Sequence, residues 1–95
     1  MRDHFAQKLH RELPGLQRDY HVRGLQLFGS VLRDDFSPES DIDILVEFTE
    51  TPSLFEFVRL ENHLTELLGR NVDLVLRSSV KEMIRERIYS EAVAV

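Results

Sequence analysis

The stretch GSVLRDDFSPESDIDILV, residues 29–46, decides how the rest of this chain folds. Its first two residues end an apolar run at 22–28, and a polar loop that contains Pro38 follows. From Asp41 to Phe48 every second residue is apolar, which is typical of a half-buried β-strand. One face of this strand carries Ile42, Ile44, Val46 and Phe48, and the other carries Asp41, Asp43, Leu45 and Glu47. We therefore expect two strands joined by a loop, with carboxylates gathered on one face of the second strand.

Helical patterns lie on both sides of this stretch. The first begins the chain, with apolar residues at Phe5, Leu9 and Leu13, and Pro14-Gly15 predicts its end. Capping-box patterns, a serine followed three residues later by glutamate, predict helices that start at Ser53 and at Ser79. Gly69 predicts the end of the middle helix. Its apolar stripe is expected to comprise Leu54, Phe57, Val58, Leu60, Leu64, Leu67 and Leu68. Phe55 falls off this stripe and is the better candidate for an exposed apolar contact.

Strand patterns alternate with these helices. They cover residues 22–28, 41–48 and 71–77, and we expect a short final strand at 92–95. The order predicts a single α+β domain over residues 1–95, built as two layers. A small mixed β-sheet would have its helices on one face, and the other face would carry Asp41, Asp43 and Asp73.

Composition narrows the function classes. The chain has 95 residues, 42% of them apolar, and no cysteine, which excludes disulfides and thiolate metal sites. No apolar run reaches the length of a membrane span, and we expect a cytoplasmic protein. The net charge is −5, and residues 34–56 carry eight acids without a single lysine or arginine. A general nucleic-acid binder would show a basic stripe instead. The acidic segment is either a solvated loop or a place that holds something positive.

Three aspartates are candidate metal ligands. Asp41 and Asp43 point to the same face of one strand, and Asp73 has the same phase on the next one. If the two strands are neighbours, three carboxylates meet on one sheet face. Oxygen ligands of this kind favour Mg²⁺ or Mn²⁺, and such a set suits two-metal attack at phosphorus. Taken alone, an Asp-x-Asp pair also fits a plain solvent-exposed face.

A candidate phosphate-binding turn precedes these aspartates. Gly29 allows close approach to the backbone, the hydroxyl and following amides at Ser30 can hold phosphate oxygens, and Arg33 can add a cation. Each residue alone also fits a simpler role, as a turn that ends a strand or as a surface arginine.

Together these residues resemble a family signature. Gly29-Ser30, then Asp41-x-Asp43 after ten intervening residues, and Asp73 on a later strand resemble the DNA polymerase beta-like nucleotidyltransferase superfamily. The forms Gly-Ser-x-x-Arg and Ser-Asp-Ile-Asp-Ile-Leu-Val are most similar to minimal nucleotidyltransferases (MNT), the small partners of HEPN-domain toxins. The resemblance covers essentially the whole chain. One departure is Asp34, where many relatives have glycine.

The resemblance implies a role for each candidate. Asp41 and Asp43 would ligate two Mg²⁺ ions, and Asp73 would ligate the catalytic ion and help to activate the attacking hydroxyl. The triphosphate of ATP would be held by Gly29, Ser30 and Arg33. The implied reaction is transfer of AMP to a tyrosine hydroxyl of a HEPN-type toxin, so the chain would act as an antitoxin within a hetero-oligomer.

Two other functions remain open at this point. The chain could be a binding module that neutralises its toxin by contact alone, with a vestigial nucleotide site. It could also transfer AMP to a small molecule such as an aminoglycoside, as a homodimer. The complete set of Gly29, Ser30, Asp41, Asp43 and Asp73 favours an enzyme.

Overall fold

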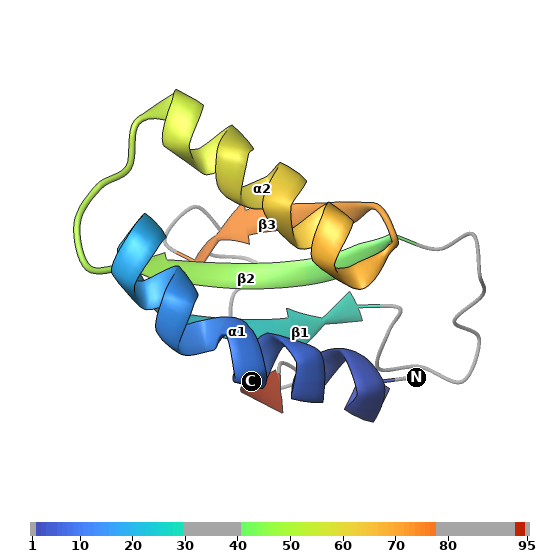
Figure 1. Ribbon diagram of the computed structural model, residues 1–95. Helices are drawn as coiled ribbons and strands as arrows, with labels where there is room; N and C mark the ends of the chain where they lie inside the picture. Colours follow the sequence, from blue (N-terminus) through green and yellow to red (C-terminus); the bar gives the residue numbers. More distant parts are fainter. Residues whose placement is uncertain (1, 30–40, 78–92, 95) are drawn as a thin grey trace.

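The computed structural model describes residues 2–29, 41–77 and 93–94 and shows a two-layer α+β arrangement (Figure 1). Its elements are α1 (Arg2–Tyr20), β1 (Val22–Phe28), β2 (Ile42–Phe48), α2 (Leu54–Leu68), β3 (Val72–Leu76) and β4 (Val93–Ala94). The strands form one sheet in the order β3-β2-β1-β4. β2 and β3 are parallel, whereas β1 is antiparallel to both β2 and β4. The predicted mixed sheet and the short final strand are thus confirmed, whereas the predicted helix from Ser79 lies outside the described residues.

Both described helices cover the same face of the sheet, α1 over β1 and α2 over β3 (Figure 1). The core between the two layers includes Leu9 of α1, Leu64 of α2 and three β2 residues, Ile42, Ile44 and Val46, all of them fully buried. Burial of each such side chain contributes about 1.5–3 kcal/mol. The alternation along β2 therefore sets which face the helices cover. Among the helices described, none combines the length and the apolar composition that a membrane crossing needs.

The first helix is longer than its sequence predicts. Pro14 lies inside α1, so the prediction that Pro14-Gly15 ends the helix is wrong. A proline inside a helix costs about 3 kcal/mol, because a hydrogen bond is lost and the ring meets the preceding turn. The apolar stripe continues beyond it, however, with Leu16 buried and Tyr20 packed against the core. Burial of these two side chains, at about 1.5–3 kcal/mol for a fully buried one, offsets that cost.

Helix α2 begins and ends as predicted. The Ser53 hydroxyl accepts a hydrogen bond from the Glu56 backbone N–H at 3.1 Å, and Gly69 ends the helix in the left-handed region at φ 68°. The predicted stripe is wrong at two positions, however, because Leu54 is 80% and Val58 is 43% exposed. The helix buries Leu60, Leu64 and Leu68, one turn apart, and this narrower stripe is enough to cover β3.

Side chains of α2 also cover part of the outer edge of the sheet. The backbone N–H of Val72 donates to the Thr65 hydroxyl at 3.2 Å, and that of Leu74 donates to the Glu61 carboxylate at 3.1 Å. Thr65 and Glu61 are one helical turn apart, and the two donors are alternate residues of edge strand β3. Because exposed strand edges invite unwanted pairing, these bonds protect the edge as well as fixing α2 on β3.

Candidate active site

The amino-terminal ends of β2 and β3 bring two of the predicted carboxylates together. In the parallel register Asp43 lies directly opposite Asp73, at a strand separation of about 4.8 Å. The Ile42 backbone N–H donates to the Asn71 carbonyl at 2.9 Å, which ties the two strand starts to each other. The condition for Asp73 to join the pair, that the two strands are neighbours, is therefore met.

Asp41 lies immediately before β2, two residues from Asp43, and alternation places both on the same side. Asp41 and Asp73 are exposed, whereas Asp43 is half-buried. Within the described ranges, no group of three or more His, Cys, Asp or Glu side chains lies close enough together to hold a metal ion. The three carboxylates thus lie at the same end of the β2–β3 pair, but their side chains are not close enough together there to surround a metal ion.

Gly29 packs directly against the side chain of Asp43. It follows the last residue of β1, Phe28, which is the antiparallel partner of Asp43, and its φ of 76° is in the left-handed region. A β-carbon at position 29 would collide with Asp43 Oδ2 and would lie 3.1 Å from its Cγ. The bare backbone therefore leaves room for the carboxylate. Sequence reasoning gave this glycine a phosphate role only, because its contact with Asp43 depends on strand register.

The two remaining candidates for triphosphate binding, Ser30 and Arg33, lie outside the described residues, as does Asp34. Their roles stay predictions.

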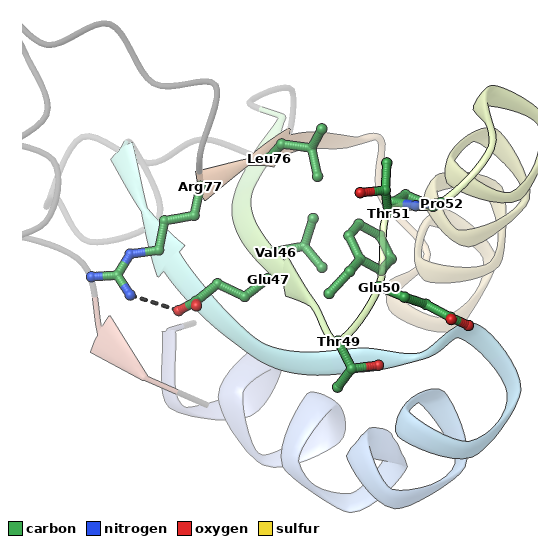
Figure 2. A pocket seen from close by; sticks show the side chains of 9 residues that line it. Val46, Glu47, Thr49, Glu50, Thr51, Pro52, Leu76 and Arg77 are labelled. Atoms are coloured by element: carbon green, nitrogen blue, oxygen red, sulfur yellow. Dashed lines mark hydrogen bonds and ion pairs between the residues drawn. The ribbon is translucent and has the colours of Figure 1, made fainter.

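The opposite end of the same strands holds a groove of about 500 Å³ (Figure 2). Its lining includes Val46 and Phe48 of β2, Leu76 of β3 and the segment 49–52 that leads into α2. Position 47 is four residues from Asp43, so this groove lies about 13 Å along β2 from the carboxylates. It is therefore a separate feature, and sequence reasoning missed it.

An ion pair closes one side of the groove. Arg77 Nη1 donates to Glu47 Oε1 at 2.6 Å, and both side chains are about one-third exposed (Figure 2). The register continues from Val46 opposite Leu76, which puts Glu47 beside Arg77. The sequence could have predicted this pair, because Glu47 and Arg77 carry opposite charges and each lies four residues after one of the two facing aspartates. Glu47 shares the face of Asp43 but lies further along the strand, as its sequence position predicts.

Comparison with known proteins identifies the family. The nucleotidyltransferase domain model matches residues 7–95. The chain is 45% identical over 80 residues to the protein adenylyltransferase MntA of Thermococcus cleftensis, covering 84% of this chain and 81% of that protein. A solved structure of a minimal nucleotidyltransferase matches with a TM-score of 0.77 and 31% identity, over 95% of this chain and 90% of the other.

A second solved structure, a toxin–antitoxin complex with AMP-PNP, matches with a TM-score of 0.71 and 26% identity. The match covers 88% of this chain and 69% of that one. In this fold the parallel β2–β3 pair and the Gly29–Asp43 contact place Gly29, Asp43 and Asp73 at one end of the sheet. This chain therefore belongs to the nucleotidyltransferase domain family, and within it to the relatives of the MntA protein adenylyltransferase.

Proposed function

We propose that this protein transfers AMP from ATP to a tyrosine hydroxyl of a HEPN-type toxin and thereby acts as its antitoxin in the cytoplasm. Support comes from its 45% identity to a protein adenylyltransferase and from its similarity to a chain of a toxin–antitoxin complex that holds an ATP analogue. The observation that carries the proposal is the pairing of Asp43 with Asp73 beside Gly29. In the superfamily that the sequence resembles, carboxylates at these positions would hold the metal ions of nucleotidyl transfer.

The donor set fits a hard divalent cation. Asp41, Asp43 and Asp73 offer carboxylate oxygens only, which Mg²⁺ prefers over softer ligands. Two acids held opposite each other on adjacent strands repel, and a cation between them relieves that repulsion. Since the side chains form no closed group of three in the described part of the chain, they would turn toward one another on binding. We propose that two Mg²⁺ ions bind here, where they would supply charge neutralisation at the phosphates.

Each residue then has a defined task. Asp41 and Asp43 would hold both ions, and Gly29 leaves the space in which the Asp43 carboxylate lies. Asp73 would ligate the catalytic ion and help to activate the attacking tyrosine hydroxyl by accepting its proton. The hydroxyl oxygen bonds to the α-phosphorus of ATP, the bond from that phosphorus to the β-phosphate oxygen breaks, and pyrophosphate leaves. Gly29, Ser30 and Arg33 would bind the triphosphate and so keep it near the hydroxyl.

The test is a labelling experiment. The protein is incubated with α-labelled ATP, Mg²⁺ and the HEPN-type toxin that we propose as its partner, and the Asp41→Ala/Asp43→Ala variant is treated in the same way. We expect the toxin to carry labelled AMP after incubation with the wild-type protein and to carry none after incubation with the variant. Replacement of the labelled tyrosine by phenylalanine should remove the label as well. If the wild-type protein leaves the toxin unlabelled while silencing it, the proposed activity is wrong.

One observation favours a second candidate, an antitoxin that acts by contact alone. The absence of a closed group of three metal-binding side chains among the described residues is what a vestigial site would also show. Silencing of the toxin by the double alanine variant, without any labelling by the wild type, would support this candidate.

A further inference from the structure

Apolar side chains are exposed on the outer face of α2. Leu54 and Phe55 are 80% and 72% exposed, and Val58 is 43% exposed. These three are the large apolar residues found exposed in the described part of the chain. Val58 lies four residues after Leu54 and three after Phe55, so the side chains are neighbours on a face away from buried Leu60. A single exposed leucine needs no explanation, but a contiguous apolar face marks an interaction site.

The groove at the carboxyl ends of β2 and β3 lies next to this face along the chain. Thr51 and Pro52 line the groove, and α2 begins two residues later with Leu54 (Figure 2). Phe48 and Leu76, which are both half-buried, add apolar lining on the sheet side. We call the groove together with Leu54, Phe55 and Val58 the docking surface. It combines exposed apolar side chains with polar groups around them, as protein interfaces do.

The border of the docking surface carries two exposed carboxylates, one of them in contact with His21, and one exposed cation, beside the Glu47–Arg77 pair. Exposed carboxylates lie at Glu50 and Glu56, and the segment 41–56 contains no lysine or arginine. Arg59 is an exposed cation next to them, and its guanidinium lies over the ring of Phe55 at 6.0 Å. A second copy of this chain would bring the same acids face to face, which like-charge repulsion disfavours. An apolar surface bordered by lysine or arginine is complementary to it.

We propose that this docking surface holds the toxin, through an apolar face of the toxin bordered by lysine or arginine. The inference rests on the proposed function, which supplies a protein as acceptor. The groove lies about 13 Å along β2 from the aspartate pair, so a toxin anchored here leaves the amino ends of β2 and β3, with their carboxylates, open to ATP. A domain larger than this distance can present its hydroxyl at those ends while it stays anchored.

The experiment separates docking from chemistry. Binding of the purified toxin is measured for the wild type and for Leu54→Ser/Phe55→Ser, whose exposed positions leave the core intact. Circular dichroism checks the fold, and the single change Phe55→Ser serves if the double variant is poorly folded. We expect the Kd for the toxin to rise at least about 30-fold, as for hot-spot residues. The KM for the toxin should rise in parallel, while the KM for ATP and kcat at saturating toxin stay unchanged.

Charge variants provide the matched control. Glu50→Lys should slow association with the toxin several-fold at low salt, whereas Glu12→Lys, the same change on an exposed site of α1, should not. A toxin Kd within twofold of wild type for the double serine variant overturns the inference. A dimer of the chain alone that the serine variant abolishes also overturns it, in favour of self-association. If the wild type labels no toxin but loses toxin binding in the serine variant, the docking surface stands and the proposed activity fails.

Discussion

The two ends of the β2–β3 pair have opposite chemistry on one scaffold. At the amino ends, Asp43 and Asp73 lie opposite each other, and Gly29 leaves space for a carboxylate. At the carboxyl ends, Glu47 and Arg77 neutralise each other beside an apolar groove. Like charges stand together at one end and opposite charges at the other, although both ends share the same buried strand. This difference agrees with our two proposals, that one end binds a cation and that the other binds a protein surface.

The variant with the largest expected effect changes only the amino end of the β2–β3 pair. Asp43→Asn keeps the shape of the side chain but removes a charge that we assign to both metal ions. We expect AMP transfer to the toxin to fall by about 10³-fold, equivalent to about 4 kcal/mol, with the Kd for the toxin unchanged. Rates at saturating toxin and a separate binding titration measure the two effects. Loss of toxin binding in this variant would contradict the separation of the two ends.

A metal titration sharpens the same contrast. At a hundredfold excess over its Kd, Mn²⁺ should stabilise the wild type by about 2.7 kcal/mol, which raises Tm by roughly 10 °C or more. Asp43→Asn and Asp73→Asn should lose most of this rise, because each leaves one carboxylate facing an amide. Glu12→Gln, on the exposed side of α1, is the control and should keep it. An equal rise in all variants would place the metal elsewhere.

Part of this contrast was predictable from the sequence. Period-two alternation from Ile42 to Val46 showed which face of β2 is buried, and it put Asp41 and Asp43 on the other face. The serine and glycine that flank α2 gave its ends, because capping depends on local contacts. Pro14 misled the prediction, since the gain from burying Leu16 is a tertiary effect that local rules do not include.

Other parts required the three-dimensional structure. Leu45 lies on the aspartate face of β2 and is nevertheless 1% exposed, although both described helices cover the opposite face. The contact of Gly29 with Asp43 depends on the register between β1 and β2, which no local pattern specifies. The groove likewise joins residues around 46–52 with 76–77, and only the parallel pairing brings them together.

Two glycines test how tightly the amino end is packed. Gly29 and Gly69 both have left-handed φ values, 76° and 68°, but only Gly29 has a side chain in the way of a β-carbon. Gly69→Ala should therefore cost about 1 kcal/mol, from backbone strain alone. Gly29→Ala should cost about 2 kcal/mol and reduce the Mn²⁺ response as well, because the Asp43 carboxylate must move. Denaturant titrations with and without Mn²⁺ measure both effects, and equal losses in the two variants would refute the role given to Gly29.

A cap variant tests the carboxyl end. Ser53→Ala removes the hydroxyl that accepts the Glu56 N–H, which should cost about 1 kcal/mol of stability. The first turn of α2 holds Leu54 and Phe55, so its fraying should also weaken toxin binding several-fold. The Mn²⁺ response should stay at the wild-type level. Thermal melts with and without Mn²⁺ and a toxin titration test this. Unchanged toxin binding despite lower stability would mean that the start of α2 is not part of the docking surface.

The smallest effect is expected from the ion pair between Glu47 and Arg77. Both groups are about one-third exposed, so screening by water leaves the pair worth roughly 0.5 kcal/mol, and Glu47→Gln should lower stability by no more than that. Toxin binding should change more than stability. The neutral glutamine side chain no longer pairs with the Arg77 charge, so this charge faces a partner surface that we expect to be basic. Toxin titration at low and high salt measures this: the variant should bind more weakly at low salt, and the difference should shrink as salt rises. Tighter binding at low salt would mean that the partner surface is acidic, and it would reverse the charge assignment of the carboxyl end while leaving the amino end untouched.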